Sequence, residues 1–195
     1  MSIIDWRLLH ERALRLSTQT IEQLGHGDLG RPTPCPGWQL ADLLGHMIGQ
    51  NLGFAAAITL PSDTTVADYA PRPLSADPLL DWADSARQLT EACAAADLAR
   101  PVLLPEISAE HRLPSWVVIG FQLLDTVVHG WDVATALGRS YRPDSELVEA
   151  TLGIARLVPN GPERLEAGAA FAPALPELDD DPWHLALTLL GRKPV

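Results

Sequence analysis

One stretch limits the possible folds of this chain more than any other: Asp125-Thr-Val-Val-His129-Gly-Trp131-Asp132. It places three polar groups inside an apolar run that begins near Trp116. An α-helix has about 3.6 residues per turn, so Asp125 and His129 lie one turn apart on one face, with Asp132 between them one turn further along. The flanking positions on that face are apolar, namely Val118, Phe121, Val128 and Ala136. The helix would therefore bury a carboxylate, which costs several kcal/mol unless the charge is compensated.

A metal ion held by Asp125 and His129 would compensate for that cost. At this spacing their Cβ atoms lie about 5–6 Å apart, which suits convergence on one ion. His46, in the middle of an expected helix over about 38–57, is the best candidate for a third ligand. Three protein ligands leave a position open for water or substrate, as in catalytic metal sites.

The same residues also have simpler interpretations, which the spacing leaves open. Asp125 and His129 could form an ordinary ion pair or hydrogen bond, and His46 could be a hydrogen-bonded core histidine. Asp132 could pair with an arginine just beyond the helix, at position 139 or 142, or it could orient a metal ligand. Cys35 is a conceivable nucleophile, but it lies between two prolines and has no base near it in the sequence.

The composition of the chain indicates where the protein is located and which classes of partner it can bind. A length of 195 residues suits a single domain over 1–195, and 47% hydrophobic residues are typical of a globular protein. A net charge of −11 argues against nucleic acid and membrane partners. The two cysteines lack CxxC spacing and no signal-peptide pattern opens the chain, so we expect a cytoplasmic protein. No uninterrupted apolar segment approaches about 18 residues, so we expect no transmembrane helix.

Helical periodicity dominates the chain. Apolar residues recur at helical spacing in four long segments, at about 2–24, 38–57, 78–96 and 115–137, and in two shorter ones, at about 143–158 and 182–190. The segments 60–76 and 97–113 read as long irregular connections, and alternation of period two is hard to find. We therefore predict an all-α four-helix bundle with long connections and a short C-terminal helix. Trp38 and Trp131 are expected to be packing residues.

One stripe of the second helix carries polar and small residues: Gln39, Asp42, His46, Gly49, Gln50 and Gly53. Two glycines on this stripe would let another backbone or a ligand approach closely.

Four motifs together resemble the DinB/YfiT-like superfamily: Thr33-Pro-Cys35-Pro-Gly37-Trp38, Leu43-Leu44-Gly45-His46, the stretch from Asp125 to Asp132, and Gly191-Arg192-Lys193-Pro194. Within it, the chain is most similar to actinobacterial proteins related to the N-terminal domain of mycothiol-dependent maleylpyruvate isomerase. The resemblance implies a bundle that holds a divalent metal ion through a histidine of the second helix and, from a later helix, a carboxylate or histidine together with a further histidine. The corresponding residues here are His46, Asp125 and His129.

Asp125 differs from the corresponding ligand that the resemblance implies for the isomerase, which is a glutamate. The glutamate side chain is one methylene longer. The shorter side chain would bring the ion nearer the helix axis, weaken its binding or select another metal. We also expect too little chain for the isomerase's additional C-terminal domain, so the resemblance does not imply maleylpyruvate isomerisation itself.

The favoured hypothesis is a metal-dependent enzyme that transfers mycothiol or a similar low-molecular-weight thiol to an electrophilic substrate, or uses it in isomerisation. Zinc is the favoured ion, while nickel, iron and manganese also suit two imidazoles and one carboxylate. Asp132 and Gln50, together with Asp42, would orient ligands or move a proton. A homodimer is compatible with this hypothesis.

Three alternatives stay open. The protein could be a non-catalytic metal-binding or small-molecule-binding sensor or carrier. Two histidines and one aspartate could also hold non-haem iron for oxygen chemistry. A purely structural bundle without metal is the third.

Overall fold

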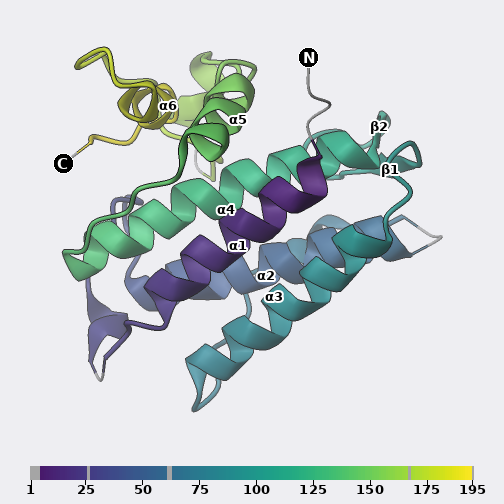
Figure 1. Ribbon diagram of the computed structural model, residues 1–195, viewed down its shortest axis with the longest axis horizontal. Helices are drawn as coiled ribbons and strands as arrows, with labels where there is room; N and C mark the ends of the chain where they lie inside the picture. The colour runs from purple at the N-terminus through teal and green to yellow at the C-terminus, as the bar shows by residue number, and fades with distance from the viewer. Residues whose placement is uncertain (1–4, 26, 61–62, 167, 195) are drawn as a thin grey trace. The chain divides into compact units, whose positions relative to one another are not determined.

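Four long helices form where the sequence predicts them: α1 (Trp6–Ile21), α2 (Leu40–Thr59), α3 (Pro78–Ala95) and α4 (Ser115–Leu137) (Figure 1). The computed structural model describes residues 5–25, 27–60, 63–166 and 168–194. It divides into two units, Met1–Tyr141 and Arg142–Val195, and the four helices belong to the first. The expected all-α bundle is confirmed, while a single domain over 1–195 stays a prediction.

Local capping explains where these helices begin and end. α1 follows Asp5, whose carboxylate accepts a hydrogen bond from a backbone amide in the first turn. Ser2, at the expected start of this helix, lies outside the described residues. Asp77 caps α3 in the same way, and α4 ends at Gly138, whose φ of +66° is left-handed and therefore suits glycine.

The bundle is held by apolar packing and by a few buried polar bonds. α1 and α4 lie side by side (Figure 1), and the Ser17 hydroxyl on α1 donates to the backbone oxygen of Thr126 on α4 at 2.9 Å. Asn51 on α2 donates to Ser85 on α3 at 3.1 Å and accepts from Gln122 on α4 at 3.0 Å. The largest fully buried side chains of this unit include Trp82, Tyr69, Ile21, Leu40, Leu43, Leu89 and Ile119.

The glycine stripe of α2 receives the chain's own backbone. The segment that contains the 3₁₀ helix η2 (Val66–Tyr69) returns along α2, and the Arg72 amide donates to the Gly45 carbonyl at 2.9 Å. A Cβ atom on Gly49 would collide with the Ala70 oxygen, and one on Gly53 would collide with the Tyr69 ring. Gly45, outside the predicted stripe, faces the same segment, and a Cβ atom there would lie 2.6 Å from the Arg72 oxygen. Of the two expected neighbours of this stripe, backbone or ligand, the structure shows backbone at Gly49, whereas at Gly53 it shows the Tyr69 side chain.

The irregular connection predicted over 97–113 is wrong in part, because it contains two short antiparallel strands. β1 (Pro101–Leu103) pairs with β2 (Arg112–Pro114), and Val102 lies opposite Leu113. Strands of three residues are too short to show an alternating pattern in the sequence. The loop between them reaches the site described below.

By length and composition α4 could cross a membrane, with a mean hydropathy of 1.2 over 18 residues, although the sequence predicted no such segment. In the described structure 83% of that window is buried inside the protein. A helix buried to this degree is typical of a globular core.

Shorter helices complete the described chain: η1 (Asp28–Gly30) precedes α2, and the second unit contains α5 (Ser145–Ala155), η3 (Pro162–Leu165) and α6 (Pro182–Leu189). α6 is the predicted short C-terminal helix. The buried Arg164 guanidinium links parts of the second unit by donating to the backbone oxygens of Pro159 at 2.6 Å and Leu189 at 2.7 Å.

Candidate metal centre

The structure brings together the three residues predicted as ligands. His46 comes from the middle of α2, and Asp125 and His129 from successive turns of α4. Asp125 Oδ1 lies 3.9 Å from His46 Nε2 and 3.4 Å from His129 Nε2. One ligand atom from each residue lies within 4.8 Å of the others.

The geometry and the donor set fit a divalent ion. Ligands about 2.0–2.1 Å from a tetrahedral zinc ion lie about 3.3 Å from one another. The two nitrogen–oxygen separations, 3.4 and 3.9 Å, are close to that spacing. The His129 side chain is only 7% exposed, whereas His46 and Asp125 keep 19% and 21%. A small molecule would therefore reach the cluster from the side of His46 and Asp125.

Charge at the cluster is unevenly shared. Burial alone would raise the pKa of Asp125, but the neighbouring His129 and His46 hold that pKa well below its ordinary value. Burial would lower the pKa of His129, but the charge of Asp125 and hydrogen bonds to Asp125, Asp132 and Cys35 raise it well above its ordinary value. The negative charge of Asp125 that raises the pKa of His129 would also attract a metal cation.

Asp132 lies behind His129 and is fully buried. Its Oδ2 atom is 2.8 Å from His129 Nδ1. With Asp132 ionised, its carboxylate would only accept hydrogen bonds, so His129 would donate through Nδ1, while Nε2 is the atom turned toward Asp125. This is the placement that a residue orienting His129 needs.

The proline-rich turn before α2 supplies two more side chains. The ring of Trp38, expected only to pack, lies 5.0 Å from the His46 ring and 6.4 Å from the His129 ring, centroid to centroid. The Cys35 sulfur lies 3.3 Å from Asp132 Oδ2 and 4.0 Å from His129 Nδ1. The sequence showed no base near Cys35 because these partners come from a helix about ninety residues later.

Gln50 follows His46 by one turn of α2, and its amide donates to Glu106 Oε1 at 3.3 Å. Glu106 lies in the loop between β1 and β2, and sequence reasoning missed it because that loop has no recognisable pattern. Although Glu106 is exposed, partial loss of surrounding water and then the charge of Asp125 raise its pKa, against the opposing effects of Gln50 and His46. Asp42, by contrast, is exposed and accepts a hydrogen bond from the Gln39 amide at the start of α2.

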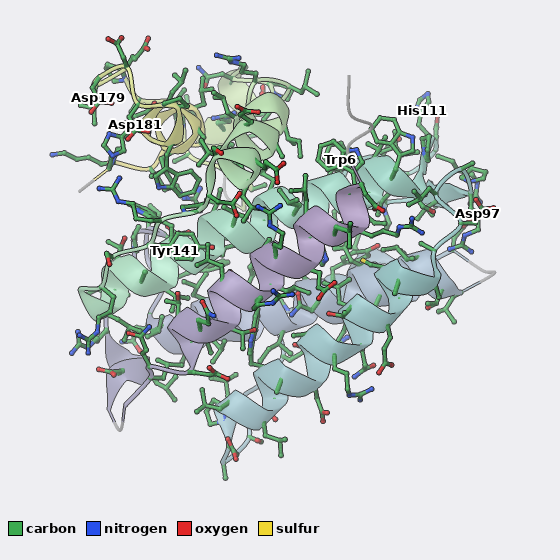
Figure 2. The ribbon with its side chains drawn as sticks, in the orientation of Figure 1. Trp6, Asp97, His111, Tyr141, Asp179 and Asp181 are labelled. Carbon is green, nitrogen blue, oxygen red and sulfur yellow. The ribbon has the colours of Figure 1, made fainter. Side chains whose placement is uncertain are left out.

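Two further histidines of the first unit have other partners. His10 is fully buried beside Cys93, with 3.8 Å between its Nδ1 and the sulfur. His111 lies beside the β1–β2 hairpin of the first unit, where Figure 2 labels it, and its Nδ1 is 3.2 Å from the Ser108 hydroxyl.

Fold and site together define a class of protein: a four-helix bundle with a cluster of two histidines and one aspartate between α2 and α4. The sequence profile of the mycothiol maleylpyruvate isomerase N-terminal domain matches residues 10–134. The chain belongs to that family, which confirms the resemblance seen in the sequence. Two uncharacterised proteins, from two strains of Mycobacterium tuberculosis, are each 30% identical to it over 178 residues, 89% of each chain.

Solved structures agree on the fold. The crystal structure of the mycothiol-dependent maleylpyruvate isomerase matches with a TM-score of 0.59 and 12% identity, over 77% of this chain and 68% of that one. A histidine-to-alanine mutant of that isomerase matches with a TM-score of 0.58 and 11% identity. At this identity the likeness shows the shared bundle and nothing more specific.

Proposed function

We propose that this protein binds one divalent metal ion through His46, Asp125 and His129 and uses it to activate a low-molecular-weight thiol of the mycothiol type. The activated thiol would be transferred to an electrophile or would assist an isomerisation. One observation carries the proposal: a half-buried carboxylate faces two imidazole nitrogens at 3.4 and 3.9 Å, in a family named for a mycothiol-dependent enzyme. The donor set suits zinc, nickel, iron and manganese. Zinc is the favoured ion because it has no redox chemistry.

A divalent ion in this site would supply a Lewis acid that lowers the pKa of a thiol so that the thiolate exists at neutral pH. The protein's own residues have separate tasks. Asp132 orients His129, and Trp38 forms an apolar wall beside both histidines that excludes water. Glu106, held by Gln50, is the carboxylate available to accept the proton released by the thiol.

Elemental analysis tests the metal site. Protein purified without chelator or histidine tag should contain about one ion per chain, and His46→Ala and His129→Ala variants should contain none. His111→Ala is the matched control, because His111 is exposed and bonded to Ser108, and this variant should keep the ion. Wild-type protein without metal, or a His129→Ala variant that retains it in full, would overturn the assignment.

The alternatives make different predictions for the same preparation. A sensor or carrier would contain the ion but consume no thiol with any electrophile. A non-haem iron protein would lose its function when zinc replaces iron. The predicted homodimer, small-molecule partners and cytoplasmic location stay predictions.

A further inference from the structure

The buried thiol of Cys35 lies on the Nδ1 side of the His129 ring, whereas Asp125 lies on the Nε2 side. Cys35 is 7% exposed and Asp132 is fully buried. The sulfur is 3.3 Å from Asp132 Oδ2, and the same oxygen is 2.8 Å from His129 Nδ1. Thiol, carboxylate and imidazole thus form one chain of contacts that ends at a candidate metal ligand.

A rigid turn holds Cys35 in this position. Prolines on both sides of Cys35 restrict its backbone. The Thr33 hydroxyl accepts a hydrogen bond from the Cys35 amide at 3.2 Å, and the Trp38 amide donates to the Cys35 oxygen at 3.1 Å. The turn before α2 therefore delivers a side chain to α4 with little freedom to move.

We propose that Cys35 is a positioning residue of the metal centre: its thiol donates a hydrogen bond to Asp132 and so fixes the carboxylate that orients His129. This inference rests on the proposed function, because it assigns Cys35 a role at that site. Asp132 Oδ2 lies within hydrogen-bond distance of both the Cys35 sulfur and His129 Nδ1, so with Asp132 ionised it would accept from both neighbours. With Nδ1 occupied, the lone pair available to a metal is on Nε2, the atom next to Asp125.

A competing assignment makes the thiol a metal ligand, since Cys35, His129 and Asp132 also offer atoms within 4.8 Å of one another. The distances favour hydrogen bonding. The nitrogen–oxygen separation of 2.8 Å is that of a charge-assisted hydrogen bond, and it is shorter than the spacing of about 3.3 Å between ligands of a tetrahedral zinc ion. The sulfur is 4.0 Å from the same nitrogen.

Metal affinity of the full chain, measured by competition with a chromophoric chelator, tests the proposal. Cys35→Ala should weaken zinc binding about tenfold, because outer partners of metal ligands contribute about 10–100-fold to affinity. Cys35→Ser retains a donor and should stay within about threefold of wild type. Cys93→Ala is the matched control, since Cys93 is also buried but contacts His10, and its affinity should not change. Thermal unfolding of each metal-free variant separates loss of affinity from loss of folding.

A second measurement distinguishes positioning from ligation. Cobalt(II)-loaded wild-type protein should show no sulfur-to-cobalt charge-transfer band, and a band that Cys35→Ser abolishes would make Cys35 a ligand and overturn the proposal. Unchanged zinc affinity in Cys35→Ala, with wild-type protein binding one ion, would overturn the positioning role while leaving the metal site intact. Wild-type protein that binds no ion would overturn both.

Discussion

His10 shows what burial does to a single titratable residue. Its side chain is fully buried, and burial lowers the pKa of His10 to about 4 from about 6.5. Between these values the unfolded chain takes up a proton that the folded protein does not. The contribution of neutral His10 to the free energy of unfolding is therefore complete above about pH 6.5 and is lost as the pH falls toward about 4.

We therefore predict that His10 alone lowers the free energy of unfolding by about 3 kcal/mol across this window. Urea unfolding at several pH values should show a steeper acid loss for wild type than for His10→Leu. His111→Gln, which changes an exposed histidine, should keep the wild-type slope. Equal slopes for wild type and His10→Leu would contradict the assignment.

Glu106 allows a second prediction for a single residue. Glu106→Gln keeps a partner for Gln50 but removes the carboxylate. The metal content should therefore not change. The metal-dependent rate of coupling mycothiol to a model electrophile should fall about a hundredfold, because the proton acceptor is lost. The matched control is Glu110→Gln, an exposed glutamate in the same loop. A Glu106→Gln variant with the wild-type rate would remove Glu106 from the mechanism.

The residues of the centre differ in how far the sequence could predict them. Asp125 and His129 share a helix, so their proximity follows from the helical repeat. His46 could be named as a candidate from its position in the second helix, but its proximity to Asp125 follows from the packing of α2 against α4, which the resemblance implied and no local pattern shows. Cys35 and Glu106 come from a turn and a hairpin loop without periodicity, and their positions follow from tertiary contacts that no local pattern records.

Among the elements, the four long helices were predictable because each repeats its apolar positions over several turns. The hairpin was missed, since each strand has three residues. The glycine stripe of α2 was recognised, but its occupant was not, because the returning segment is irregular. That segment gives a prediction for a helix–backbone contact.

Gly49→Ala should lower the free energy of unfolding by about 1–3 kcal/mol, because the new methyl group would collide with the Ala70 oxygen. Helix propensity alone would instead stabilise the variant by about 1 kcal/mol. Ala56→Gly, on the same helix, measures the propensity effect without that collision. Chemical denaturation of both variants measures the two changes in the free energy of unfolding. A Gly49→Ala variant more stable than wild type would show that the segment does not pack as described.

For the whole molecule, the candidate centre belongs to the first unit, Met1–Tyr141, and the family profile over 10–134 includes all three candidate ligands. The hydropathy of α4 is high enough for a membrane span, yet the helix is buried in the bundle with Asp125 and Asp132 on it. A net charge of −11 favours cations over phosphate-rich partners. These properties agree with a metal-binding protein that acts on small molecules.

The absorption spectrum of the cobalt(II)-loaded protein during titration with mycothiol tests the central claim most directly. We predict that a sulfur-to-cobalt charge-transfer band grows with added thiol, saturates at one thiol per bound ion and is absent from the His129→Ala variant. A cobalt-loaded protein whose spectrum does not respond to the thiol would contradict the claim that this centre binds and activates it.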